Sequence, residues 1–164
     1  RYLSLAKDKR SQEYGLALYN LGYTDFKQKN YSGALNWFNR FVSEANNNNR
    51  QVLAAAYNRM GDCNFYVRNF DSARQSYQKA EQIDPSLADY SLYQEGFVKG
   101  LQRDYNGKIQ SLNQLIMNYP QSQYIDDALY EQGRAFVQLE DNAKHDCNNN
   151  TCSSFYVCIC IASV

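Results

Sequence analysis

The chain has 164 residues, and its 17 basic and 17 acidic side chains give a formal net charge of zero. A chain of this length can form about seven helices of ordinary size. The balanced charge lacks the basic face typical of nucleic-acid-binding proteins, and no apolar run approaches the ~20 residues that cross a bilayer. We therefore expect no nucleic-acid partner and no membrane insertion by this segment.

Four glycines recur at similar spacing and in similar surroundings: Gly22, Gly61, Gly96 and Gly133. With each of them at position 8 of a repeat, the repeats span Gly15–Asn48, Ala54–Leu87, Asp89–Ser122 and, in part, Asp126–Lys144. A fixed period of about 34 residues is typical of stacked helix–turn–helix units. The sequence therefore predicts an all-α fold, an α–α superhelix of about three and a half such repeats.

The chain begins in the middle of this pattern. Aligning Gly22 with Gly61 places Arg1–Ser4 opposite Arg40–Ser43, which ends a second helix. With neither an initiator methionine nor a signal peptide, the segment is expected to be a fragment truncated at both ends. Further along, the asparagine run Asn46–Asn49 is expected to form a plain loop, because asparagine side chains compete with backbone hydrogen bonds.

Other repeat positions agree where close helix packing requires it. Glycine at position 8 lets the two helices of a hairpin approach closely. The small partner expected at position 20 is Ala34 or Ala73, whereas the third repeat has Lys108. Pro85 and Pro120 fall where second helices must end. Position 17 is aromatic in the three full repeats, as Tyr31, Phe70 and Tyr105. Position 24 is large, as Phe38, Tyr77 and Leu112, and position 27 holds Phe41, Ala80 and Leu115.

This set of positions resembles the tetratricopeptide repeat (TPR) family over roughly residues 1–144. The match is carried by Leu18, Leu21, Gly22, Ala34 and Phe38, and then by Tyr57, Gly61, Ala73, Tyr77, Ala80 and Pro85. The resemblance implies hairpins stacked in series, with the first helix of each lining a concave groove. The expected core comprises Leu18, Leu21, Phe38, Tyr57, Tyr77, Leu112 and Leu129.

The resemblance also implies which side chains point into the groove, namely those at positions 2, 5, 9, 12 and 13 of each repeat. The candidate peptide-binding residues are Leu16, Tyr19, Tyr23, Asn58, Asp62, Tyr90, Tyr93, Phe97, Tyr130 and Arg134. Phe26, Phe65 and Tyr66 are expected to pack partly on the next repeat. Tyrosine suits a binding surface because it combines contact area, hydrogen bonding and few rotamers. Aromatic residues at helical spacing are also typical of a core, and both interpretations stay open.

Groove positions 5 and 9 argue against one family binding mode. Chaperone-adaptor TPRs hold a terminal carboxylate with Lys and Asn there, whereas this chain has Tyr19 and Tyr23, then Asn58 and Asp62. An extended or helical segment laid along aromatic pockets fits better. We therefore expect a non-catalytic scaffold that binds another protein in its groove. The alternatives are a structural or oligomerisation spacer, self-associating through exposed terminal helices, and recognition of glycan or peptidoglycan.

The third junction carries a finer resemblance. Tyr119-Pro120-Gln121-Ser122, followed by Asp127-Ala128-Leu129-Tyr130, resembles repeats of bacterial cell-envelope lipoproteins. It implies a periplasmic or outer-membrane-associated protein, with a cytoplasmic location as the alternative.

Nothing in the repeats points to catalysis, which needs convergent groups with tuned protonation. Cys63 is expected to be a small buried residue, Asp126-Asp127 to start a helix, and Glu140-Asp141 to lie at a turn between helices. The sequence therefore predicts neither an enzyme nor a cofactor or metal site.

The repeat pattern ends after Lys144, and residues 145–164 contain His145 and four of the five cysteines. A foreign or out-of-frame extension is the favoured interpretation, ahead of a native extension with disulfides and of a metal site. The spacing of Cys147, Cys152, Cys158 and Cys160 lacks the C-x2-C pairs of familiar zinc modules. The run Phe155–Ile161 is expected to pack on the uncovered last helix.

Overall fold

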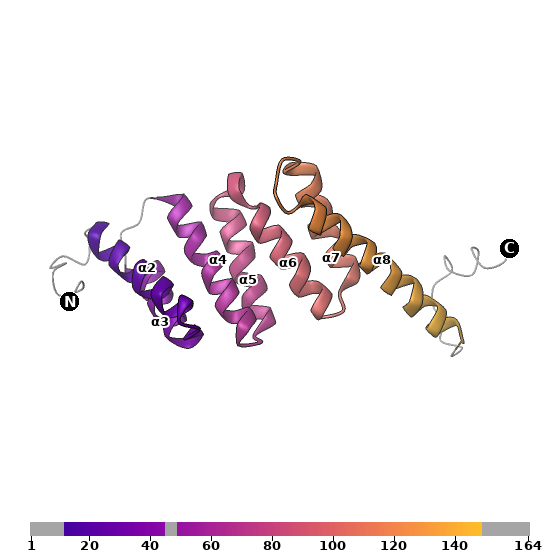
Figure 1. Cartoon of the computed structure of the whole chain (residues 1–164), viewed down its shortest axis with the longest axis horizontal. Helices are drawn as coiled ribbons and strands as arrows, with labels where there is room; N and C mark the ends of the chain where they lie inside the picture. The colour runs from indigo at the N-terminus through magenta and orange to yellow at the C-terminus, as the bar shows by residue number, and fades with distance from the viewer. Residues whose placement is uncertain (1–11, 45–48, 149–164) are drawn as a thin grey trace.

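The computed structural model describes residues 12–44 and 49–148. The described helices are α2 (Gln12–Lys27), α3 (Tyr31–Glu44), α4 (Arg50–Tyr66), α5 (Phe70–Ile83), the short 3-10 helix η1 (Pro85–Leu87), α6 (Asp89–Leu101), α7 (Tyr105–Asn118) and α8 (Ile125–Asn148). In Figure 1 the pairs α2–α3, α4–α5 and α6–α7 form hairpins in a row, and α8 follows as a single long helix. The prediction of an all-α superhelix of repeats is confirmed.

The three hairpins turn in the same way. Lys29, Arg68 and Arg103 have φ values of 61°, 63° and 63°, so one left-handed residue ends the first helix each time. The next residue then caps the second helix with its side chain. Asn30 accepts from the backbone N–H of Gly33 at 3.2 Å, Asn69 from that of Ser72 at 3.4 Å, and Asp104 from that of Gly107 at 2.9 Å. A cap of this kind satisfies a backbone donor that has no partner within its helix.

Within each hairpin the repeat glycine meets a large side chain of the second helix. A Cβ added to Gly22 would lie 2.8 Å from Phe38, one on Gly61 would lie 2.7 Å from Tyr77 Cδ1, and one on Gly96 would lie 3.1 Å from Leu112. All three distances are shorter than ordinary van der Waals contact, and the first two are shorter than real Cβ atoms show. The predicted close approach at position 8 is therefore confirmed for these three hairpins.

Apolar contacts run across the repeat boundaries. One cluster joins Leu18 of α2 and Phe38 of α3 to Met60 and Cys63 of α4. Another joins Leu92 and Leu112 to Ala128 of α8. A hairpin that buries its apolar face only against its neighbours is the unit of a solenoid. The predicted burial of Cys63 is confirmed, and burial raises the pKa of its thiol to about 12.

The connections between hairpins follow the sequence closely. Asn49, the last asparagine of the run, caps α4 by accepting from the backbone N–H groups of Gln51 and Val52 at 3.0 and 3.3 Å. Helix α5 ends at Ile83, just before Pro85, and α7 ends at Asn118, just before Pro120. Both prolines thus lie where they were expected to end a helix.

Helix α8 departs from two expectations. Glu140 and Asp141 lie inside this continuous helix, so the predicted turn at these residues is wrong. Position 17, which is aromatic in the other repeats, is Asn142 here. Without an aromatic side chain to fold back onto the first helix, a return turn gains little, and a sequence rich in good helix formers continues as helix. Leu129, predicted to be core, is 50% exposed because no described helix covers that side of α8.

Some expectations lie outside the described residues. These are the equivalence of residues 1–4 with a helix end, the loop at 46–48 and the packing of 155–161. His145 and Cys147 lie in the last turns of α8, but the structure does not describe their side chains.

Lys108, the exception at position 20, is buried and reaches across to the next repeat. Its ammonium group donates to Glu131 of α8, and Arg134 also donates to Glu131 at 3.0 Å. Burial by itself would raise the pKa of Glu131, but the two cations outweigh it and hold this pKa below the ordinary 4.5. The position that favours alanine elsewhere here carries one half of an ion pair between α7 and α8.

Two glycine substitutions separate a covered glycine from an open one. Gly61→Ala should lower the free energy of unfolding by roughly 1–3 kcal/mol, because the buried Tyr77 ring leaves no room for a methyl group. Gly133→Ala should raise it by about 0.5–1 kcal/mol, because nothing described lies within 4 Å of the added Cβ. Urea denaturation followed by circular dichroism measures both values. A marked loss of stability in Gly133→Ala would contradict the uncovered position of Gly133 on α8.

Removal of the Glu131 charge should expose the cost of burying Lys108. Glu131→Gln is expected to lower stability at pH 7 by about 3–5 kcal/mol, since it leaves a buried cation without its carboxylate. The lowered pKa of Glu131 means that its contribution is present above about pH 4.5 and is lost as pH falls through the folded-state pKa. Urea denaturation between pH 7 and pH 3 should therefore show the difference between wild type and variant shrinking in acid.

Two controls accompany this experiment. Arg134→Gln should cost less than about 1 kcal/mol, because the Arg134 side chain is 62% exposed. The double variant Lys108→Met, Glu131→Leu should recover most of the stability, since an apolar pair can replace a buried ion pair. Equal stability of wild type and Glu131→Gln at pH 7 would show that the pair contributes nothing.

Candidate functional site

A hollow of about 400 Å³ lies on the side of the molecule formed by the first helices of the hairpins. It crosses three repeats, since α2, α4 and α6 all contribute to its wall. Its lining residues are Phe26, Arg59, Asp62, Phe65, Tyr66, Tyr77, Tyr90, Tyr93, Gln94 and Phe97. Seven of these ten are aromatic, so the hollow is suited to apolar and ring-bearing side chains of a ligand.

Arg59 is the cationic centre of this hollow. Its guanidinium lies 5.6 Å from the ring centre of Phe26 and 5.4 Å from that of Tyr90, in cation–π contact with two neighbouring repeats. One nitrogen, Nη1, lies 2.7 Å from Asp62 Oδ2. Burial lowers the pKa of Arg59, but Asp62 and the nearby tyrosine hydroxyls outweigh it and hold this pKa above its ordinary value. The side chain is therefore charged, and it remains 29% exposed in the hollow.

Asp62 lies at the floor of the hollow and ties three helices together. Its Oδ1 accepts hydrogen bonds from the hydroxyls of Tyr77 at 2.9 Å and Tyr90 at 2.7 Å. Burial raises the pKa of the Asp62 carboxyl more than Arg59 and the two hydroxyls lower it. With only 5% of its surface exposed, Asp62 holds Arg59 and the tyrosines in place and offers little surface to a ligand.

The aromatic rings at the rim are fixed by one another. Tyr66 stacks on Tyr31 of the preceding repeat, with ring centres 4.4 Å apart and planes 9° from parallel. Tyr93 stacks on Tyr124 at 5.3 Å. Phe65 and Phe97 meet at 6.0 Å between α4 and α6. Rings held in this way lose little freedom when a ligand covers them, which favours binding.

The first repeat contributes less than expected. Tyr19 is half-buried, packs edge-on against Phe38 and Phe41 at 5.7 and 5.6 Å, and has its pKa raised by burial. Tyr23 is exposed, with the Lys27 ammonium 5.3 Å from its ring centre. Leu16 is exposed as well, but neither Leu16 nor Tyr23 lines the 400 Å³ hollow.

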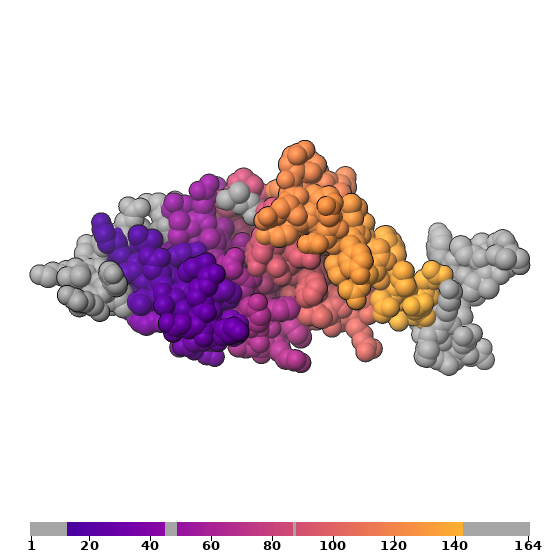
Figure 2. All heavy atoms as spheres, viewed as in Figure 1, coloured from indigo at the N-terminus to yellow at the C-terminus, as the bar shows by residue number. Residues whose placement is uncertain are grey.

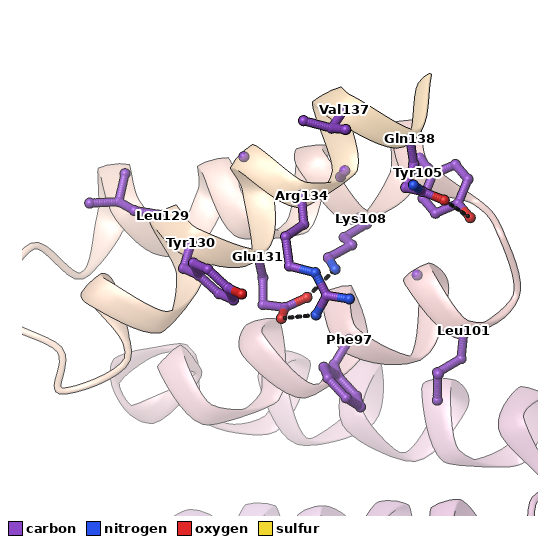
Figure 3. Close-up of a pocket in the computed structure, with 13 residues that line it drawn as sticks. Phe97, Leu101, Tyr105, Lys108, Leu129, Tyr130, Glu131, Arg134, Val137 and Gln138 are labelled. Atoms are coloured by element: carbon purple, nitrogen blue, oxygen red, sulfur yellow. Dashed lines mark hydrogen bonds and ion pairs between the residues drawn. The ribbon is translucent and has the colours of Figure 1, made fainter. Parts of the chain in front are cut away.

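A second hollow, of about 680 Å³, lies where α6, α7 and α8 meet (Figure 3). Phe97 lines both hollows, so they adjoin along α6. In Figure 3, Glu131 and Arg134 extend from α8 toward Phe97, and Arg134 lies 5.9 Å from the ring centre of Tyr130. Tyr130 and Arg134, the candidate residues of the fourth repeat, are both exposed here.

The structure thus brings together Asp62, Tyr90, Tyr93 and Phe97 in one hollow, and Phe97, Tyr130 and Arg134 in the other. Asn58 lies outside both, where its Oδ1 accepts from Ser91 Oγ at 2.9 Å across α4 and α6. Sequence reasoning missed Arg59 and Gln94, because neither occupies a position that the family usually turns into its groove. The available signal for Arg59 was its charge, since it is a cationic residue in a first helix whose neighbouring groove positions are rich in aromatic side chains.

Within residues 12–44 and 49–148, no helix combines the length and hydropathy needed to cross a bilayer. In the same part of the chain, no three His, Cys, Asp or Glu side chains converge in a manner that could hold a metal ion.

The chain is similar to several solved helical-repeat structures. The Arabidopsis OM64 TPR domain is 17% identical, with 76% of this chain and 95% of that chain covered and a TM-score of 0.64. The TPR2B domain of yeast Sti1, solved in complex with pHsp70, is 12% identical, with 76% and 97% covered and a TM-score of 0.65. The second TPR domain of human RPAP3, in complex with an HSP70 peptide, is 15% identical, with 74% and 93% covered and a TM-score of 0.62.

At these identities the likeness concerns the fold. No curated protein matches the sequence closely enough to count as a relative. The tetratricopeptide repeat family model matches residues 54–87, the limits of the second repeat. The chain thus contains a tetratricopeptide repeat at residues 54–87 and folds as a tetratricopeptide-repeat solenoid.

Proposed function

We propose that this chain is a non-catalytic scaffold that binds a segment of another protein along its aromatic groove. The observation that carries the proposal is the 400 Å³ hollow, in which the first helices of three repeats set aromatic side chains around one charged arginine. Aromatic rings supply apolar contact area, and the tyrosine hydroxyls and Arg59 supply directional polar contacts. This combination suits a peptide better than a small polar metabolite.

Tyr66, Tyr93 and Phe97 are the residues we expect to contact the segment most directly. Tyr66 is 55% exposed, and Phe97 lies where the two hollows adjoin. An extended segment seated at Phe97 can continue toward Tyr130 and Arg134 on α8. Asp62 then acts indirectly, since it fixes the position of Arg59.

Two of the similar structures hold chaperone-derived ligands, pHsp70 for yeast Sti1 and an HSP70 peptide for human RPAP3. They support a peptide as the class of ligand for this groove. We propose that its ligand is not held by a terminal carboxylate clamp, because Tyr19 packs into the core and Asp62 is acidic and buried. A location in a bacterial cell envelope stays part of the proposal and rests on the sequence around Tyr119–Tyr130.

A structural or self-associating module is the second candidate, favoured by the exposed apolar side chains of α8. In that case the groove itself would bind nothing. Sedimentation velocity over a hundredfold range of protein concentration distinguishes the candidates. A constant monomer mass supports the peptide scaffold, whereas concentration-dependent growth supports the module.

The groove proposal can be tested without knowledge of the natural partner. Twelve-residue peptides selected from a random phage-displayed library on the whole chain should bind it, and fluorescence anisotropy gives their dissociation constants. Phe97→Ala and Tyr66→Ala should each weaken binding at least about tenfold, or about 1.4 kcal/mol, because each removes a ring from the wall of the hollow.

Met117→Ala is the matched control, since Met117 is 79% exposed on α7 and lines neither of these hollows. It should leave affinity within about twofold, and circular dichroism should show that all variants are folded. Selected peptides whose affinity is the same for wild type, Phe97→Ala and Tyr66→Ala would refute the groove as the binding site.

A further inference from the structure

One side of α8 carries apolar residues that no described part of the chain covers. Leu129, Gly133, Phe136 and Val137 are spaced by three and four residues, which places them on one face of the helix. Phe136 is 54% exposed and Val137 is 56% exposed. In Figure 2 the end of α8 that is drawn in yellow extends beyond the other described helices. We name Leu129, Gly133, Phe136 and Val137 the open face.

The three complete hairpins show what packs against the equivalent face of a first helix. Gly22, Gly61 and Gly96 stand at the same repeat position as Gly133, and each is covered by a large side chain of the following helix. Nothing among the described residues lies within 4 Å of a Cβ added to Gly133. Helix α8 therefore presents half of a helix–helix interface, in which the glycine recess is present and no side chain among the described residues enters it.

The described chain does not supply this second helix. A return turn would be expected near Glu140 and Asp141, and α8 instead continues to Asn148. The large residues that cover the earlier glycines come from helices that already pack inside their own hairpins. Within residues 12–44 and 49–148, no helix therefore covers the open face.

Charge distinguishes a second copy from a different protein. In a symmetric antiparallel pairing about Gly133, Asp126 and Asp127 of one copy would face Glu140 and Asp141 of the other. Like charges placed together in this way oppose association. A partner helix with Lys or Arg at its C-terminal end would instead meet Asp126 and Asp127. Such residues also suit the negative end of its own helix dipole.

We propose that the open face binds an amphipathic helix of another protein, antiparallel to α8. The partner helix inserts a large apolar side chain, aromatic or leucine, over Gly133, and it carries basic residues at its C-terminal end. The open face lies outside the 400 Å³ hollow at Arg59, but Leu129, Gly133 and Val137 also line the second hollow, so it adjoins the path proposed for the bound segment at Tyr130 and Arg134. The partner helix is an occupant additional to the segment of the proposed function.

A probe for this surface can be taken from the chain itself. Residues 31–44, the sequence of α3, place Phe38 over a repeat glycine and provide the expected apolar stripe. The probe is this sequence with three lysines added at its C-terminus and fluorescein at its N-terminus. Binding to the whole chain is measured by fluorescence anisotropy at low salt. A free peptide of this length is barely helical, which weakens its binding to every variant alike. The test therefore compares the dissociation constant of each variant with that of wild type.

Gly133→Leu should weaken binding of the probe at least about tenfold, because the new side chain fills the recess that Phe38 of the probe would enter. Phe136→Ala, a second variant at an exposed position, should weaken it about threefold to tenfold. Met117→Leu on α7 is the control and should change affinity by less than about twofold. Replacing the three added lysines with glutamates should weaken binding by about threefold to tenfold, and high salt should remove that difference.

Several results would overturn the proposal. The probe fails to bind the whole chain, or it binds wild type and Gly133→Leu equally well. Binding that is lost in Tyr66→Ala but retained in Gly133→Leu would place the probe in the groove instead, since Tyr66 lines the 400 Å³ hollow and not the second one. Self-association that Gly133→Leu abolishes would identify a second copy as the occupant. Retention of probe binding in Tyr66→Ala supports the open face, and it does so whether or not the groove binds library peptides.

Discussion

The close approach of two helices at a glycine is the contact on which the structure depends. Where Phe38, Tyr77 or Leu112 covers the glycine, the hairpin closes and its outer sides become surfaces for the next hairpin. No hairpin buries its apolar residues alone, so each closed hairpin packs on the next one and the repeats stack in a row. Helix α8 shows the converse, since it keeps the glycine, no described side chain covers it, and Leu129, Phe136 and Val137 are exposed.

Buried acids at successive repeat boundaries add a second constraint. Asp62, Glu95 and Glu131 are almost inaccessible to solvent, and their cationic partners are Arg59, Lys99 and Lys108. A buried charge is tolerated only when it is paired. The Lys108–Glu131 pair joins α7 to α8, whereas the other two pairs lie within α4 and α6. Asp62 and Glu95 reach neighbouring helices through hydrogen bonds from Tyr77 and Tyr90 and from Gln78. Only one of the three pairs opens into the aromatic hollow. The Asp62 pair keeps Arg59 charged between two rings, and a structural ion pair thereby shapes the candidate binding site.

The candidate groove and the open face differ in how their aromatic residues are supported. In the groove, rings such as Tyr31 and Tyr66 stack on each other across repeats, so a preformed surface awaits a ligand. On α8, Phe136 and Val137 are more than half exposed. The groove therefore suits a flexible segment that adapts to fixed rings, whereas the open face suits a rigid helix that brings its own complementary side chains.

The sequence by itself determined the helical class, the period and the hairpin contacts, because glycine, aromatic and proline positions act locally or between helices adjacent in the chain. It also located Tyr93 and Phe97, which the structure places at one hollow. It could not show that Tyr19 would pack against Phe38 and Phe41, that buried Asp62 would accept hydrogen bonds from two tyrosine hydroxyls, or that Arg59 would become the centre of the hollow. Those outcomes depend on contacts between residues 15 to 33 positions apart, and only the tertiary arrangement decides which side chains meet there. The continuation of α8 through Glu140 also depends on tertiary contacts. An aromatic residue at position 17 stabilises a turn only by packing on the first helix of its own hairpin, and that contact is not visible in the sequence.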